Sequence, residues 1–316
     1  MAAPQKSRSK IDIEALLSET HRTELQVSFR QRLLDLLDAE EEFVPSASSV
    51  LGRLWSLIQS EESSLEECSA VISLDPALTA RIFRIANSSV HRANAENVQQ
   101  AVLHLGMAKL KQIAFNAQIF ARFSAIALPA GWEHFWIRNI FVAQLTEKTA
   151  SFYFRTNGTE YLSGMLHDVG WPLMAAFFPE EFTAVLSNSL PLEQAEKEIL
   201  SFGHAEISAA VCAKSNFPPR IVNAVLYHHR PMLLESGNFK PVESAAFLGV
   251  LLSICDRLAD AASLPIGGRV EERDLTHLLE LPEVKWLSRF GPLPDFAAMV
   301  EKELASAQEL CGIFLG

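Results

Sequence analysis

The chain lacks the long apolar run that a membrane-spanning helix requires. None of its stretches reaches the roughly 18 to 20 uninterrupted apolar residues that are needed to cross a bilayer. It begins MAAPQKSRSK, which is polar, and no apolar segment of a secretion signal follows. We therefore expect a cytoplasmic protein that does not bind membranes.

Cysteine is scarce, and its spacing offers no thiol-based motif. The four cysteines are Cys68, Cys212, Cys255 and Cys311, which lie far apart and form no CxxC pair. Each lies within an apolar stretch, as the buried thiols of proteins in a reducing compartment do. We expect all of them to be packing residues.

Basic residues are fewer than acidic ones. The chain has 27 lysines and arginines against 38 aspartates and glutamates, which gives a formal net charge of −11. This charge opposes non-specific attraction to DNA, RNA and anionic lipid. The glycine loop GxxxxGK[ST], which holds nucleotide phosphates, is also absent. Nucleic acid is therefore not expected as a partner.

The alternating pattern of β-strands is almost absent, and helical patterning replaces it. Hydrophobic residues make up 49% of the chain, and they recur at steps of three and four residues, the period of an amphipathic helix. One helix start is especially clear, because Asp75 can accept hydrogen bonds from free backbone N–H groups and Pro76 fits the first helical position. No block repeats at a fixed period. We predict an all-α fold.

The first part of the chain is predicted to be a flexible leader followed by one helix. Residues 1–22 are polar and should not pack. Residues 23–43 should form an amphipathic helix. Its apolar face consists of Leu25, Phe29, Leu33 and Leu36. This face packs either on the chain's own core, which we favour, or on another protein.

The rest of the chain is predicted to be a two-lobed domain with a C-terminal extension. The domain spans residues 44–240, with an N-terminal helical lobe at about 44–128 and a second lobe at about 129–240. Pro129 and Gly131 mark the junction between the lobes. Residues 241–316 should form a helical extension that completes the second lobe.

Polar side chains on otherwise apolar helical faces are the main chemical signal. They are His167 with the adjacent Asp168, then His204, His228 with His229, and Asp256. A single histidine on an apolar face is more often a hydrogen-bonded core residue than a ligand, and a helical aspartate is usually paired. Taken in order, however, these imidazoles and carboxylates match the ligands of Fe, Mn, Ni or Zn. Gly170 is predicted to cap the helix that carries His167.

Four stretches in this order resemble the HDOD branch of the HD superfamily of metal-dependent phosphohydrolases. They read VISLDPALTARIFRIANSS, VQQAVLHLG, YLSGMLHDVGWPLM and FGHAEISAAVCAKSNFPPRIVNAVLYHHRP, and they cover roughly residues 44–232. HDOD domains are helical output domains of bacterial signalling proteins. The resemblance implies an HD-like helical core in the second lobe and protein partners in a bacterial signalling pathway. It also implies a cleft between the lobes that could take a small ligand or nucleotide.

The resemblance further implies a partial site for one or two divalent ions, Fe, Mn, Ni or Zn. Its ligands would be His167, Asp168, His204, His228, His229 and Asp256. The family motif WRHS usually supplies a further histidine, but residues 136–139 read WIRN and place Arg138 there. A guanidinium keeps its proton and has no lone pair, so it cannot bind a metal. His134 lies one helical turn earlier, about 5.4 Å away, which is too far to compensate.

Arg138 is therefore expected to pair with Asp168 or Asp256 and to leave an ion-pair network in place of the metal site. Trp171 follows the glycine after the His-Asp pair, where HD-GYP phosphodiesterases, which hydrolyse cyclic-di-GMP, carry a lysine. The favoured function is a non-catalytic signalling module without a cofactor or a catalytic residue. The alternative is a metal-dependent phosphohydrolase, in which His167, Asp168 and Asp256 could still hold one ion. Both readings leave the oligomeric state open.

Overall fold

The protein is described by a computed structural model that covers most of the chain. The described residues are 29, 31–35, 50, 53, 54, 57, 63–124, 132–215, 217–234, 244–266 and 275–315. They form helices and no β-strand, which confirms the all-α prediction. None of the helices within these ranges is both long and apolar enough to cross a bilayer. The predicted leader, Leu25, Leu36, Pro129 and Gly131 lie outside the described residues.

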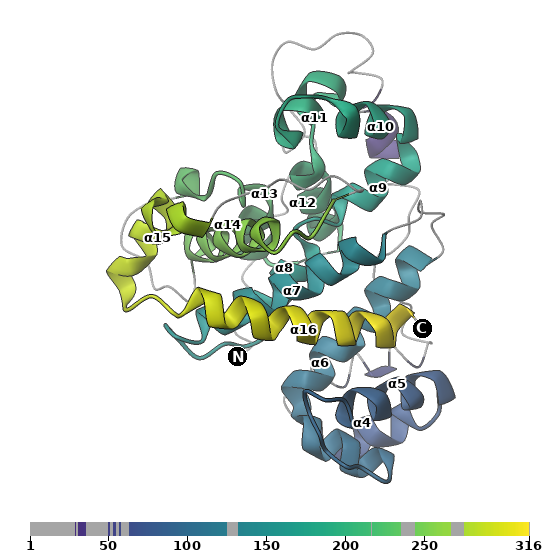
Figure 1. Cartoon of the computed structure of the whole chain (residues 1–316). Coiled ribbons are helices and arrows are strands. Elements are labelled where there is room, and N and C mark those ends of the chain that lie inside the picture. The colour runs from purple at the N-terminus through teal and green to yellow at the C-terminus, as the bar shows by residue number, and fades with distance from the viewer. Residues whose placement is uncertain are drawn as a thin grey trace, which may run out of the picture.

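The first lobe consists of α4 (Leu65–Ile72), α5 (Pro76–Ala86) and α6 (Val98–Ser124), as Figure 1 shows. At the start of α5, the Asp75 carboxylate accepts hydrogen bonds from the N–H groups of Ala77 at 2.9 Å and Leu78 at 3.1 Å. This confirms the predicted N-cap. The long α6 bends at Gly106, whose φ of 72° and ψ of 168° are not helical. A glycine without a Cβ adopts this conformation readily.

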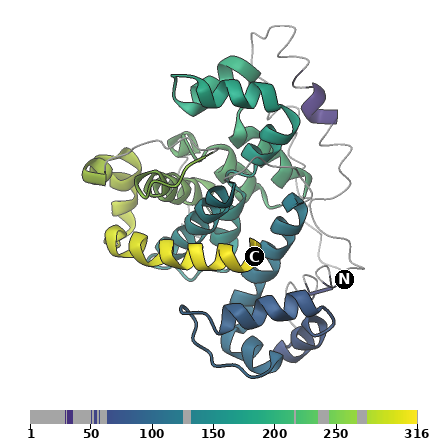
Figure 2. The same ribbon diagram turned by 45° about the vertical axis from the view of Figure 1, so that its right-hand side comes forward.

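The second lobe is a bundle of shorter helices around α7 and α14. Its helices are α7 (Glu133–Ala150), α8 (Thr159–Leu166), α9 (Gly170–Phe177), α10 (Pro179–Ser187), α11 (Leu192–Leu200), α12 (His204–Lys214), α13 (Pro219–Leu226) and α14 (Ala245–Ala261). α7 and α14 are buried on most of their surfaces, because α8, α13 and α16 pack around them. Figures 1 and 2 show both helices inside this lobe.

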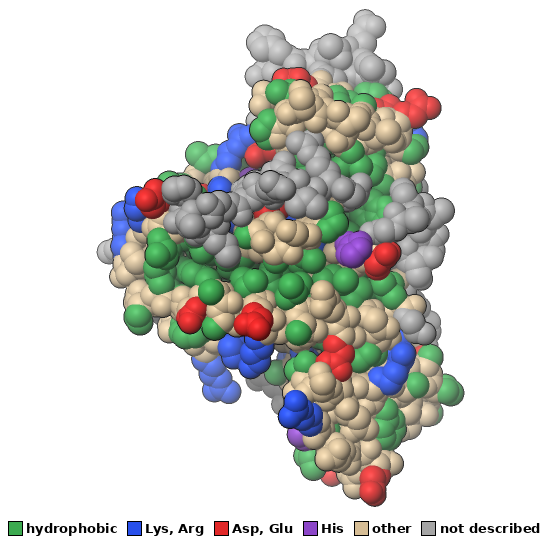
Figure 3. Space-filling model, in the orientation of Figure 1, with side chains coloured by type: hydrophobic (Ala, Val, Ile, Leu, Met, Phe, Trp, Pro, Cys, Tyr) green, Lys and Arg blue, Asp and Glu red, His purple; other side chains and the backbone are tan. Residues whose placement is uncertain are grey.

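The C-terminal part of the chain contacts both lobes. It contains η1 (Pro231–Leu234), η3 (Leu275–Glu280), α15 (Pro282–Leu287), η4 (Ser288–Phe290) and α16 (Phe296–Leu315). α16 runs along α7, where Gln144 donates a hydrogen bond to Ser306 at 2.9 Å. At its end, α16 reaches the first lobe, and the Arg84 guanidinium donates to the carbonyl of Ile313 at 3.0 Å. On the face in Figure 3, hydrophobic side chains form a band across the middle.

The described part of the N-terminal helix packs on the chain's own core. Phe29 and Leu33 are buried, and the Phe29 ring contacts Phe178 edge to face at 5.9 Å between centroids. We expect Leu33→Ala to lower the free energy of unfolding by about 2–5 kcal/mol, because it leaves a cavity in the core. Gln31→Ala, on the exposed face, should change it by less than about 0.5 kcal/mol. Equal urea-unfolding curves for both variants would contradict core packing of this helix.

Candidate functional site

The structure brings all six residues predicted as metal ligands together in the second lobe, beside Arg138. Arg138 comes from α7, His167 and Asp168 from the turn after α8, His204 from the start of α12, His228 and His229 from the turn after α13, and Asp256 from α14. All are buried except His229, which is half-buried. The segments that carry them lie far apart in the sequence, so the site depends on the packing of the whole lobe.

Arg138 binds the carboxylates that would otherwise face a metal ion. The side chain is 1% exposed, and its Nη2 atom lies 2.5 Å from Oδ1 of Asp256 and 2.8 Å from Oδ1 of Asp260. Nη1 donates a hydrogen bond to the carbonyl of Leu264 at 2.9 Å. Nε lies 3.7 Å from Oδ2 of Asp168. The predicted pairing of Arg138 with Asp256 is confirmed, and Asp260 is an additional partner.

The charges in this cluster stabilise one another in spite of their burial. Burial alone would lower the pKa of Arg138, but Asp256, Asp260 and Asp168 outweigh it and raise that pKa. Burial alone would raise the pKa of Asp256, yet Arg138 and His167 hold it well below its usual range. The guanidinium and the Asp256 carboxylate are therefore charged at neutral pH, as a buried ion pair requires.

His167 takes part in the same network as a hydrogen-bond donor. Its Nδ1 atom donates to the carbonyl of Gly164 at 2.7 Å, and its Nε2 atom lies 3.3 Å from both Oδ2 of Asp168 and Oδ1 of Asp256. Burial lowers the pKa of His167, but the two carboxylates overcome this effect and raise it to about 10. A protonated imidazole has no lone pair for a metal. In this state, His167 is a cation and not a ligand.

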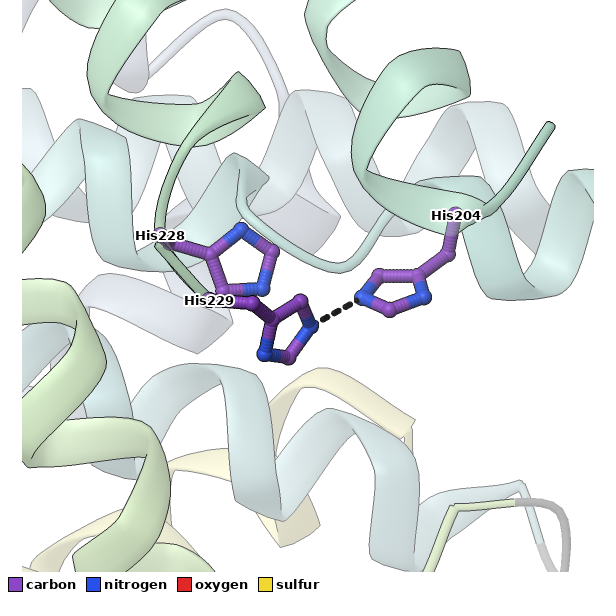
Figure 4. A group of neighbouring side chains, drawn as sticks. All are labelled: His204, His228 and His229. Atoms are coloured by element: carbon purple, nitrogen blue, oxygen red, sulfur yellow. Dashed lines mark hydrogen bonds between the residues drawn. The ribbon is translucent and has the colours of Figure 1, made fainter. Parts of the chain in front are cut away.

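The opposite side of the site is built from three imidazoles. The Nε2 atoms of His204 and His229 lie 2.8 Å apart, with His228 next to them (Figure 4). Nδ1 of His204 lies 2.8 and 3.0 Å from the two carboxylate oxygens of Glu196, which is fully buried. Burial lowers the pKa of His204, but Glu196 and Asp168 raise it to about 9. His204 thus donates to Glu196 and to His229.

His228 and His229 keep their lone pairs. Burial and the nearby His167 lower the pKa of His228 to about 4, and burial and His228 lower that of His229 well below its usual value. Nδ1 of His228 donates to the carbonyl of Val225 at 2.6 Å, so its Nε2 atom is an acceptor. Among the described residues, this Nε2 atom has no hydrogen-bond partner, and neither does Oδ1 of Asp168, 3.7 Å away.

Gly170 and Trp171 both contact the start of α12, and the helix cap predicted at Gly170 is not observed. Gly170 does not cap a preceding helix but begins α9, so the predicted cap is wrong. The physical reason is a close approach of two backbones, because a Cβ atom on Gly170 would lie 2.2 Å from the carbonyl oxygen of His204. The Trp171 ring stacks on the His204 ring at 4.7 Å and 16°. Both residues therefore hold α12 and its histidine in place.

Asp260 and Glu196 are site residues that the sequence analysis missed. Asp260 lies one helical turn after Asp256 on α14, and this spacing was a visible signal. Glu196 lies on α11, and nothing in its local pattern predicts a contact with His204. His134 is exposed on α7, as expected for a residue that does not replace the lost ligand.

The part of the site around Arg138 does not fit the metal ion that the resemblance implies. His167, His228 and Asp256 offer ligand atoms within 4.8 Å of one another, but the Arg138 guanidinium binds Oδ1 of Asp256 and Oδ1 of Asp260. A divalent ion placed there would be repelled by this permanent cation. On the histidine side, His228 and His229 keep unprotonated nitrogens, whereas Nε2 of His204 carries the proton that it donates to His229.

Comparison with known proteins agrees with this arrangement of helices. The HDOD domain family matches residues 44–231, more than half of the chain. The chain belongs to the HDOD family. The match spans the first lobe and the second lobe as far as His228 and His229, and it ends before α14, which supplies Asp256 and Asp260. The carboxylates that bind Arg138 from α14 are thus outside the matched region.

Several proteins share this HDOD fold. An HDOD domain protein of unknown function from Geobacter sulfurreducens has a TM-score of 0.69, 20% identity and coverage of 96% of this chain and 98% of its own. A Shewanella amazonensis SB2B protein described as a candidate phosphohydrolase has a TM-score of 0.65, 23% identity and coverage of 90% and 98%. A candidate signal transduction protein from Marinobacter aquaeolei VT8 has a TM-score of 0.63, 20% identity and coverage of 97% and 69%.

A curated relative is longer than this HDOD chain. It is an uncharacterized protein of Treponema pallidum (strain Nichols), 23% identical over 248 residues that make up 75% of this chain. The chain spans only 46% of the length of that relative. At these levels of identity, the structural neighbours establish the fold and leave the activity to be argued from the site.

Proposed function

We propose that this HDOD protein is a non-catalytic signalling module whose former metal site is held together by an arginine. The observation that carries the proposal is the Arg138 guanidinium, which is buried at 2.5 Å from Asp256 and 2.8 Å from Asp260. HD-type hydrolysis needs a metal-bound water with a pKa near 7 and a cation on the phosphoryl oxygens. Arg138 supplies a positive charge but cannot bind or activate water as a metal does.

A fixed ion-pair network suits a protein that relays a state instead of turning over a substrate. α14 carries Asp256 and Asp260, α7 carries Arg138, and α16 packs along α7 and reaches α5 and α6. A partner or small ligand that shifts the first lobe against α16 would act directly on α7. Protein partners in a bacterial signalling pathway are part of this proposal, and the name of the Marinobacter aquaeolei neighbour agrees with it.

The second candidate function is a metal-dependent phosphohydrolase. Its supporting observation is the group of His204, His228 and His229, each of which offers one ligand atom within 4.8 Å of the others. The Shewanella amazonensis SB2B neighbour is itself described as a candidate phosphohydrolase. This function is less well supported, because Arg138 occupies the position of the family's first histidine ligand. The site for a second ion is thereby removed.

Assays of unmodified protein separate the two functions. Protein purified without a nickel column and supplied with Mn²⁺ or Fe²⁺ should show no turnover of cyclic dinucleotides or of bis(p-nitrophenyl) phosphate above a metal-only blank. Arg138→His should raise the bound Mn or Fe by one ion per chain, because it returns a lone pair to the site. Arg289→His, at an exposed position in η4 outside the site, should leave the metal content unchanged. Stoichiometric Fe or Mn with turnover in the unmodified protein would refute the non-catalytic function.

A further inference from the structure

We infer that the end of α16, residues 309–315, is a strap that holds α5 of the first lobe against the second lobe, and that it opens when its charged contacts are weakened. This inference deepens the proposed function and rests on it, because it names the movement that the signalling module would relay. Figures 1 and 2 show this end of α16 beside the first lobe, while the rest of the helix lies along α7 of the second lobe.

Two arginines of α5 bind the C-terminal carbonyl groups of α16. Arg84 donates a hydrogen bond to the carbonyl of Ile313 at 3.0 Å, and Arg81 donates one to the carbonyl of Phe314 at 3.4 Å. The last carbonyl groups of a helix have no partner within the helix, and a cation near them is stabilising. Positive charge on the first lobe therefore binds the end of a helix that belongs to the second lobe.

A carboxylate of α16 binds the segment that follows α5. Oε1 of Glu309 accepts a hydrogen bond from the backbone N–H of Ser89 at 2.9 Å, and Oε2 accepts one from the Ser89 hydroxyl at 2.8 Å. Arg81 adds a cation–π contact, because its guanidinium carbon lies 5.8 Å from the centroid of the Phe314 ring. Each of these contacts between α16 and the α5 region thus involves an ionised side chain.

The later part of α6, by contrast, is fixed to the second lobe and to α16 by buried groups. Asn116 donates a hydrogen bond at 2.8 Å to the hydroxyl of Tyr161 on α8. The Phe120 ring lies 4.8 Å from the Trp136 ring of α7, and the Phe314 ring of α16 stacks on Phe120 at 5.0 Å and 8°. Weakening the charged contacts leaves this apolar packing in place.

The earlier part of α6 is joined to the first lobe, and the bend at Gly106 separates the two parts. Nε2 of His104 lies 3.0 Å from the carbonyl oxygen of His91, in the connection between α5 and α6. Gly106 has a φ of 72° and a ψ of 168°, a conformation that is essentially confined to glycine. A Cβ atom there would meet nothing within 4 Å. This bend is therefore the hinge about which α5 moves when the strap opens.

Salt distinguishes the two kinds of contact. Arg84 and Ser89 are exposed, and Glu309 is half-buried, so their interactions are screened by dissolved ions. Raising the ionic strength from about 0.1 M to about 1 M shortens the Debye length from about 10 Å to about 3 Å. Apolar packing carries no charge to screen. High salt should therefore release α5 from α16 and leave α16 on α7, the helix that carries Arg138.

Electron–electron distance measurement between two nitroxide labels tests the strap. Gln99→Cys on α6 and Ala184→Cys on α10 place exposed thiols on the two sides of the Gly106 bend, and the four native cysteines are buried. The labelled chain should give one narrow distance distribution at low salt. Adding Glu309→Ala together with Arg84→Gln should raise the ratio of open to closed molecules by at least about tenfold, because charge-assisted hydrogen bonds are removed.

Glu301→Ala is the matched control, because it removes the same charge from an exposed position of α16. It should leave the distance distribution unchanged. The labelled chain without strap substitutions should show the open population in about 1 M NaCl. This salt measurement decides the question by itself if the double variant loses its helical circular dichroism.

The outcomes that would overturn the strap are specific. They are a distribution that the folded double variant and high salt leave unchanged, or one that Glu301→Ala broadens as much as the double variant does. Neither measurement involves a metal ion or a substrate. Unchanged distances therefore refute the strap alone, whereas phosphodiester turnover refutes the non-catalytic function.

Discussion

Arg138→Met is expected to lower the free energy of unfolding by about 3–5 kcal/mol, because it leaves buried carboxylates without their cation. Arg138 is 1% exposed and binds Asp256 and Asp260 directly. Urea unfolding at neutral pH measures the loss. Arg230→Met is the matched control, since Arg230 pairs with Glu193 at 2.7 Å but its side chain is 61% exposed. Arg230→Met should lower the free energy of unfolding by less than about 1 kcal/mol.

The loss caused by Arg138→Met should also depend on pH in a defined direction. Arg138 lowers the pKa of Asp256 in the unmodified chain, so this pair contributes stability above the unfolded-state pKa of about 3.9 and loses it on acidification. Without Arg138, the buried carboxyl gains stability when it is protonated. The difference between the two proteins should therefore shrink as the pH falls from 7 toward 4. A neutral-pH loss below about 1 kcal/mol would show that another cation neutralises these carboxylates.

Gly164→Ala is expected to lower the free energy of unfolding by about 3 kcal/mol through steric overlap of two helices. A Cβ atom on Gly164 of α8 would lie 2.4 Å from Cα and 2.7 Å from N of Ala143, which are backbone atoms of α7 and cannot rotate away. The same packing joins α7, which carries Arg138, to α8, which directly precedes His167.

Gly312 provides the control for this substitution. It lies within α16, and a Cβ atom there would meet nothing within 4 Å. Gly312→Ala should therefore raise the stability by about 0.5–1 kcal/mol, because alanine loses less conformational freedom in a helix. Thermal and urea unfolding of both variants measure the contrast. If Gly164→Ala lowered the free energy of unfolding by less than about 0.5 kcal/mol, as an ordinary surface substitution does, the close packing of α7 on α8 would be contradicted.

The sequence predicted those helices whose apolar residues are periodic. The helical period of the sequence predicts helices at about 134–151, 160–169, 192–201, 204–215, 219–229 and 244–260, and these agree with α7, α8, α11, α12, α13 and α14 to within about three residues at each end. α9, Gly170–Phe177, was missed because GWPLMAAF is apolar on all sides and buried, which leaves no amphipathic period to detect. α10 begins only two residues later at Pro179 and could not be separated from its apolar surroundings.

The sequence predicted which polar residues lie together at the site and that Arg138 pairs with a carboxylate. Arg138 could be assigned to a carboxylate because a permanent buried cation requires a counter-charge, and Asp256 satisfies that requirement. Glu196 and Trp171 could not be assigned, since their contacts with His204 depend on how α9, α11 and α12 pack. Gly170 was misread for the same reason, because the constraint on it comes from the backbone of His204.

A crystal structure of protein purified without added metal, with anomalous scattering data at the Fe and Mn edges, shows directly whether Arg138 or a metal ion lies beside Asp256. We expect guanidinium density for Arg138 between Asp256 and Asp260 and no anomalous peak between His167 and Asp256. Two anomalous peaks on either side of Asp168, with Arg138 turned away from Asp256, would refute a site that is held together by Arg138.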